Sequence, residues 1–243
     1  WEPEPEPLPP ATPLASTAFA ARRATSDLRN ASHLFNTTSV WTIELRFSPE
    51  SWAAMEPRQI EPLRERWGPN GEFLLRNPEA SRNGLAGVRG IEFDWVEADV
   101  RFEDRAFPRS AVRYKGNGTY LRSQRSIKRP LKIDLNKHVK SHELASRTTL
   151  NLANLVTDDS CLHDVLAYEL YRDAGVVAPR TAYARVWIRT NDTASRCLGV
   201  YALVENIDAD FAGERLGSRH GALFKPVTHD LFADLGEDWA AYD

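Results

Sequence analysis

The sequence contains little of what several functional classes require. It has two cysteines in 243 residues, Cys161 and Cys197. This pair is compatible with two buried free thiols or, in an exported protein, with one disulfide. A metal site is not indicated, because no histidine lies at ligand spacing from either thiol. No apolar run approaches the ~20 residues that a membrane-spanning helix needs, so no membrane span is predicted.

Catalytic and nucleotide-binding signatures are also missing. The sequence holds no GxxxxGK[ST] loop, GxGxxG fingerprint, HExxH or GxSxG. Their absence removes the usual anchors for a P-loop nucleotide site, a dinucleotide fold, a zinc protease and a serine hydrolase. The net charge is -3 and the pI is near 6.1, which argues against general nucleic-acid binding.

The chain divides by composition into a spacer and a folded part. Residues 1–34 begin WEPEPEPLPP, in which proline alternates with glutamate, so an extended lead-in is predicted there. Such spacers often tether or precede an exported domain, and we therefore expect an exported or surface location. Residues 35–243 carry the hydrophobic patterns of one folded domain.

Those patterns predict an α+β fold with a mostly antiparallel sheet. Apolar alternation and turn signals predict strands at 40–47, 90–94, 96–102, 112–115, 131–135, 181–189, 197–205 and 222–227. Short helices are expected at 48–57 and 208–216. A longer helix after Asp159 would bury the face formed by Leu162, Val165, Leu166 and Leu170.

Positive charge is concentrated in one stretch, VRYKGNGTYLRSQRSIKRPLKIDLNK, residues 112–137. In a strand at 131–135, Lys132 and Asp134 would both point away from the core, and Arg113 and Lys115 would share one face of the preceding strand. If these two strands are neighbours, the cations converge beside a Gly-Asn-Gly turn whose glycines let backbone N–H groups approach a ligand. Polyphosphate suits that arrangement, although exposed arginines and lysines are more often solvated surface.

The same stretch resembles the spore coat protein H (CotH) kinase family. The resemblance continues through TTLNLANLVTDDSCLHDVLAYELYRDAGVVAPRTAYARVWI, LGVYALVENIDADFAGERLG and GALFKPV. It implies an atypical protein-kinase-like fold that transfers the γ-phosphoryl group of ATP, with Mg²⁺, to serine or threonine of a protein.

The resemblance also implies site residues. Lys115, Gly116 and Asn117 match the family's Lys-Gly-Asn motif, and Lys132 matches a second lysine, so these residues and Arg113 are expected to bind the phosphates of ATP. Asp159 and Glu205 match recurrent acidic positions, and Glu205 is expected to border the adenine pocket. The alternative for Asp159 is a helix cap.

The family's metal-binding and catalytic aspartates lie in motifs that do not occur before Asp243. The resemblance therefore predicts that the Mg²⁺ ligands lie downstream and that these residues alone are inactive. A non-catalytic surface or adhesion module with a kinase-like fold is the alternative. A carbohydrate-binding β-rich module is a third interpretation, with no obvious aromatic platform to support it.

Overall fold

The computed structural model describes residues 28–64, 67, 69–70, 77–81, 84–190 and 193–221. In chain order its elements are α1 Ala31–Leu34, β1 Val40–Phe47, α2 Pro49–Ala54, β2 Arg58–Gln59, α3 Leu85–Val88, β3 Ile91–Glu92, β4 Val96–Phe102, β5 Arg105–Tyr114, α4 Gly118–Ser123, β6 Leu131–Asp134, β7 Thr149–Ala153, α5 His163–Asp173, β8 Thr181–Thr190, β9 Arg196–Val204 and α6 Ala209–Leu216. None of the helices in the described ranges has the length and apolarity to cross a bilayer. The strand predicted at 222–227 lies outside the described residues.

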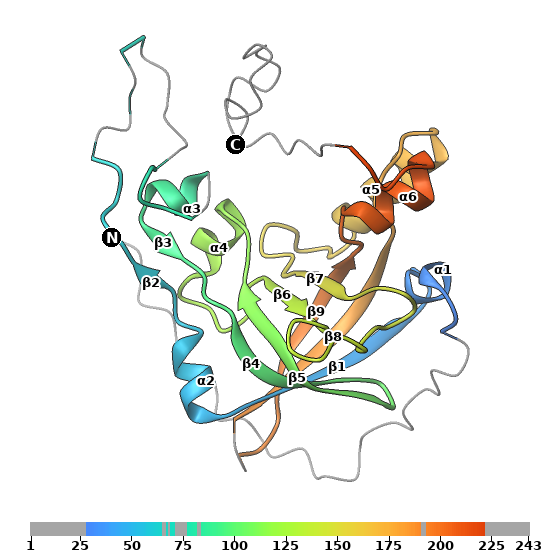
Figure 1. Cartoon of the computed structure of the whole chain (residues 1–243), viewed down its shortest axis with the longest axis horizontal. Helices are drawn as coiled ribbons and strands as arrows, with labels where there is room; N and C mark the ends of the chain where they lie inside the picture. The colour runs from blue at the N-terminus through green and yellow to red at the C-terminus, as the bar shows by residue number, and fades with distance from the viewer. Residues whose placement is uncertain are drawn as a thin grey trace.

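Seven strands close into a barrel in the order β1-β4-β5-β6-β7-β9-β8 (Figure 1). Every neighbouring pair is antiparallel except β1 and β8, which run parallel and close the barrel. The short strands β2 and β3 form a separate antiparallel pair. The predicted α+β class with a mostly antiparallel sheet is confirmed.

The barrel interior is the hydrophobic core. Alternate residues of each strand point inward, as in β4, where Val96, Ala98, Val100 and Phe102 are buried between exposed neighbours. The largest fully buried side chains include Tyr201, Phe47 and Phe102. Packing begins earlier in the chain than predicted, because α1 lies ahead of Phe35 and buries Leu34 in this core.

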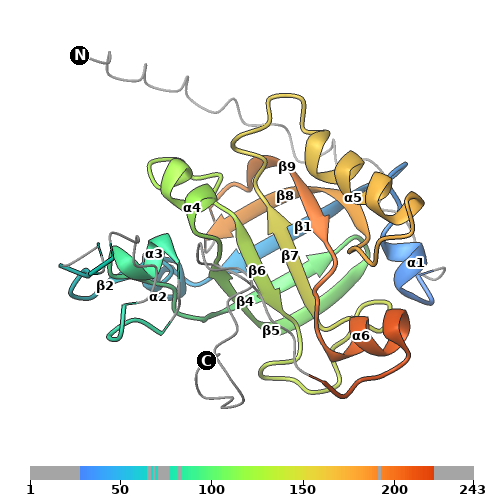
Figure 2. The same ribbon diagram turned by 90° about the horizontal axis from the view of Figure 1, so that it is seen from above.

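The helices lie outside the barrel in two groups. α1, α5 and α6 lie to one side of the barrel, and α2, α3 and α4 lie to the other (Figures 1 and 2). α2 begins as predicted, with Ser48 accepting a hydrogen bond from the Ser51 N–H and Pro49 in the first turn. α6 also ends as predicted, at Gly217 in the left-handed conformation.

The α5 helix departs from its predicted packing. Only Val165 of the expected apolar face is buried, while Leu162, Leu166 and Leu170 are exposed. Periodicity identifies an apolar face, but it does not show which element covers that face.

The two cysteines are far less buried than expected. Both are free thiols, with Cys161 half-buried and Cys197 exposed, so the alternative of a disulfide between them is wrong.

Candidate functional site

The predicted phosphate-binding residues come from two paired strands. β5 and β6 are antiparallel neighbours, and Arg113 stands directly opposite Lys132. Leu131 and Ile133 point into the core, so Lys132 and Asp134 lie on the outer face of the barrel. The pairing predicted from sequence is therefore confirmed, and it brings the guanidinium of Arg113 and the amine of Lys132 onto one surface.

The Lys132 amine is positioned by two asparagines that sequence reasoning missed. Its Nζ lies 3.4 Å from Oδ1 of Asn206, and the same oxygen accepts a hydrogen bond of 3.0 Å from Nδ2 of Asn151. Asn151 is the register neighbour of Lys132 on β7. The Asn206 amide in turn donates to Asp208 at 2.7 Å. The sequence held a signal for Asn151, which is a polar residue between two leucines of a strand. It held none for Asn206, which reaches Asn151 only in the folded chain.

Arg113 is held beside this amine in a half-buried position. Its guanidinium carbon lies 4.7 Å from the centre of the Trp95 ring, and the Lys137 amine lies 5.3 Å from the same ring. Burial lowers the pKa of Arg113, and the charge of Glu92 opposes that shift. Within the described part of the chain, Nε of Arg113 and Oδ1 of Asp134 are buried without a hydrogen-bond partner. Buried polar atoms of this kind are uncommon and favour a ligand or water at the site.

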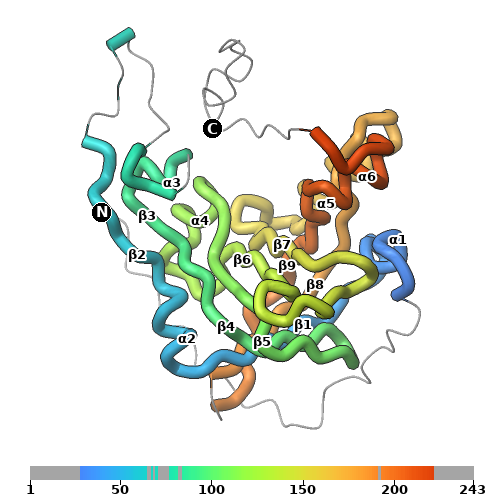
Figure 3. Tube along the Cα trace, viewed as in Figure 1, coloured from blue at the N-terminus to red at the C-terminus, as the bar shows by residue number. Residues whose placement is uncertain are grey.

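The Lys-Gly-Asn turn is fixed at both ends. The Lys115 N–H donates to the Pro130 carbonyl at 3.0 Å, which continues the β5–β6 ladder. Asn117 accepts a hydrogen bond of 3.2 Å from the Ala86 N–H, so the turn is tied to α3. Figure 3 shows α4, which follows the turn, lying near α3. Lys115 is half-exposed and directly follows β5, the strand that carries Arg113.

Gly116 is required by the backbone of this turn, and Gly118 is not. Gly116 has φ +87°, and a Cβ there would lie 2.6 Å from Oγ1 of Thr119, whereas a Cβ at Gly118 meets nothing within 4 Å. Gly116→Ala is expected to lower the free energy of unfolding by about 1–2 kcal/mol, and Gly118→Ala to leave it unchanged or raise it slightly. Urea denaturation of both variants measures the difference, and equal effects would contradict it.

Not every cation of the basic stretch is available for a ligand. Arg129 donates through Nη1 to both carboxylate oxygens of Glu56 at 2.8 Å, and its guanidinium lies 5.0 Å from the centre of the Tyr114 ring. The Arg129 carbonyl accepts a hydrogen bond of 3.1 Å from the Tyr201 hydroxyl. Arg129 therefore anchors the loop between α4 and β6 to the barrel. Arg122 and Arg125 of this stretch are exposed.

Glu205 lies in a separate cluster of buried ion pairs. Its side chain is fully buried, and its carboxylate pairs with Arg180 and, at 3.1 Å, with Arg147. Both arginines also pair with Glu214 on α6, and the Arg215 guanidinium lies 3.7 Å from Glu205. The structure does not bring this carboxylate to Lys132; it brings the next residue, Asn206. A contact between Glu205 and adenine stays a prediction.

Asp158 binds the first N–H group of α5, at His163. Asp158 accepts a hydrogen bond of 2.7 Å from the His163 N–H, and the Ser160 hydroxyl donates to it at 2.5 Å. The hydrogen bond from the Ser160 hydroxyl lowers the pKa of Asp158 most; desolvation opposes it, and the backbone N–H and charge of His163 lower the pKa further. The N-cap residue of α5 is Leu162, so the interpretation of Asp159 as the helix cap is wrong.

The comparison with protein families covers the part of the chain that holds these residues. A family model described as CotH kinase protein matches residues 112–241, more than half of the chain. The match starts within β5 and takes in the Lys-Gly-Asn turn, Lys132, Asn151, Glu205 and Asn206. This chain belongs to the CotH kinase family. No curated protein matches the sequence.

Proposed function

We propose that this chain provides the ATP-binding face of a CotH-type protein serine/threonine kinase. In this proposal the reaction transfers the γ-phosphoryl group of ATP to a hydroxyl of a surface or secreted protein. The observation that carries the proposal is the register that places Arg113 opposite Lys132 on the outer face of the barrel, beside the Lys-Gly-Asn turn. Membership of the CotH kinase family supports a kinase-like protein that uses a nucleotide and a metal.

The side chains at this face fit a triphosphate. Phosphoryl transfer depends mainly on positioning and on neutralising the charge of the phosphate oxygens. Lys132 supplies an ammonium group held near Asn206, and Arg113 supplies a planar fork of donors with an unpartnered buried Nε. Lys115 and the N–H groups of the glycine turn add further donors at the edge of the same face.

The proposal treats the barrel as the nucleotide-facing lobe of an atypical kinase fold that spans residues 35–243. Mg²⁺ would neutralise phosphate charge when bound with ATP. Among the described residues no three histidine, cysteine, aspartate or glutamate side chains gather at metal-binding distance. We therefore assign no metal ligand to this part of the chain, and the roles above belong to its cations and amides.

Calorimetric titration with Mg-ATP tests the proposal. Lys132→Ala is expected to weaken ATP binding about tenfold, because it removes one charge-assisted phosphate contact. Lys140→Ala is the matched control, since this lysine is exposed, lies outside β5 and β6, and contacts the carbonyl of Lys137. The double variant Lys115→Ala/Lys132→Ala should bind more weakly still.

An ATP affinity that is unchanged in the double variant would remove the phosphate role of these lysines. A native chain without saturable ATP binding would instead favour the non-catalytic surface module. The exported location belongs to the same proposal and is checked by fractionation of the producing cells.

A further inference from the structure

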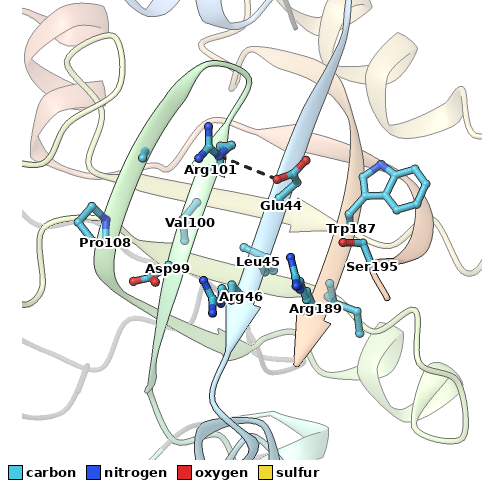
Figure 4. A pocket seen from close by; sticks show the side chains of 12 residues that line it. Glu44, Leu45, Arg46, Asp99, Val100, Arg101, Pro108, Trp187, Arg189 and Ser195 are labelled. Atoms are coloured by element: carbon cyan, nitrogen blue, oxygen red, sulfur yellow. Dashed lines mark ion pairs between the residues drawn. The ribbon is translucent and has the colours of Figure 1, made fainter. Parts of the chain in front are cut away.

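A pocket lined by three arginines lies on a part of the barrel that carries none of the proposed ATP-binding residues. It has a volume of about 310 Å³ and is built on β1, β4 and β8, the start of β5 and the loop that follows β8. Arg46, Arg101 and Arg189 line it, together with Glu44 and Asp99 (Figure 4). Arg113 lies near the other end of β5, and Lys132 lies on β6.

Two of these arginines stand side by side. β1 and β8 are parallel neighbours, and Arg46 is the register partner of Arg189. Figure 4 shows both side chains next to each other on adjoining strands. Like charges at paired positions of neighbouring strands repel each other and destabilise the sheet. An anion bound between the two guanidinium groups would contact both of them and lower this repulsion.

The two acidic residues of the pocket have partners of their own. Asp99 is the register partner of Arg46 on β4, yet its Oδ1 accepts a hydrogen bond of 3.1 Å from the Arg109 N–H. Glu44 lies 4.0 Å from Nε of Arg101, which is the outer limit for an ion pair. With three arginines against two carboxylates, the lining keeps a net positive charge.

The remaining lining residues can contact the part of a molecule that carries a phosphoryl group. Ser195 adds a hydroxyl, and Trp187 and Pro108 add apolar surface at opposite ends of the pocket (Figure 4). Guanidinium forks match the oxygens of a phosphoryl group in geometry and charge. The pocket volume exceeds that of a phosphate group alone, which leaves room for part of the molecule that carries it.

We propose that this pocket binds a phosphoryl group through Arg46 and Arg189, with Arg101 as the third cation. The group is supplied either as free phosphate or by a phosphorylated peptide that contacts Trp187. This site is separate from the ATP-binding face and does not depend on the proposed kinase activity.

Fluorine NMR of the full chain labelled with 5-fluorotryptophan tests the site at the pocket itself. The Trp187 resonance is assigned from its loss in Trp187→Phe. Inorganic phosphate and a phosphoserine peptide are titrated separately at constant ionic strength, and the same peptide with unmodified serine or with glutamate is titrated for comparison. We expect a saturable shift of the Trp187 resonance with the phosphorylated peptide, with inorganic phosphate, or with both.

Three variants connect the shift to the arginines. Arg46→Ala and Arg189→Ala should each weaken binding about tenfold, since each removes one charge-assisted contact. Arg185→Ala is the matched control, because Arg185 is exposed on β8 outside the pocket lining. The Lys132→Ala variant should retain the shift, which separates this site from the ATP-binding face.

Each outcome decides the proposal. A saturable shift with either probe supports it, and a shift with only one of the two identifies the source of the phosphoryl group. Absence of a saturable shift overturns it. A shift that the glutamate peptide produces equally well, or that Arg185→Ala weakens as much as Arg46→Ala, shows a general cationic surface and also overturns it.

Discussion

Arg180→Ala is expected to lower the free energy of unfolding by about 3–5 kcal/mol, because it removes the main partner of a fully buried carboxylate. Arg180 donates to Glu205 through its backbone N–H and Nε, each at 3.0 Å, and also through Nη2. Nη1 of Arg180 lies 2.9 Å from the Glu214 carboxylate. The substitution keeps the backbone N–H but removes the guanidinium from both acidic groups, which leaves Arg147 to pair with both and Arg215 with Glu205 at 3.7 Å.

Urea denaturation near neutral pH measures this loss. Arg185→Ala on the exposed face of β8 is the control and should change stability by less than about 0.5 kcal/mol. A loss below about 1 kcal/mol for Arg180→Ala would show that the cluster contributes little to the fold.

The pH dependence of stability provides an independent measurement of the same cluster. Burial alone would raise the pKa of Glu205, but the hydrogen bonds and charge of Arg180 outweigh it, so the pKa lies below its ordinary value of 4.5. The pKa of Glu214 is lowered in the same way. A lowered folded-state pKa gives stability that is complete above about pH 4.5 and is lost as the pH falls through the folded-state value. Glu205→Gln should reduce this loss on acidification.

Tyr201→Ala is expected to cost a similar 3–5 kcal/mol, roughly, through the loss of packing. Tyr201 is fully buried inside the barrel, and burial raises the pKa of its hydroxyl. The ring also supports the basic loop, because its hydroxyl donates to the Arg129 carbonyl at 3.1 Å and the Lys128 amine lies 5.6 Å from its centre.

Tyr201→Phe separates these two contributions. It keeps the ring and removes the hydroxyl, so it should cost only about 1 kcal/mol. Chemical denaturation of both variants gives the comparison. Equal losses would show that the hydrogen bond to the loop, and not the packing of the ring, accounts for the effect of Tyr201.

The local features of the site were predictable because they follow from strand alternation. The pattern of Leu131 to Asp134 alone indicates that Lys132 points away from the core, and two strands that follow each other in the chain are often neighbours in a sheet, as β5 and β6 are. The asparagines that hold Lys132 were not predictable, since Asn151 and Asn206 meet only after β7 and β9 have paired.

Barrel closure and the ion-pair cluster depend on distant segments and leave no local signal. The strand pattern of β1 is equally compatible with an open sheet, and nothing within it indicates a parallel partner at Thr181–Thr190. Arg147, Arg180, Glu205 and Glu214 come from four separate parts of the chain. Isolated charges in a sequence are more often solvated, so their burial could not be inferred.

The parallel contact between β1 and β8 also has a consequence for biosynthesis. During translation β1 emerges early, whereas the strand that completes its hydrogen bonding emerges only once Thr190 has left the ribosome. Until then one edge of β1 offers unpaired N–H and C=O groups to any other extended chain. The nascent polypeptide therefore passes through a long aggregation-prone interval, in which a chaperone that shields that edge would have most effect on the yield of folded protein.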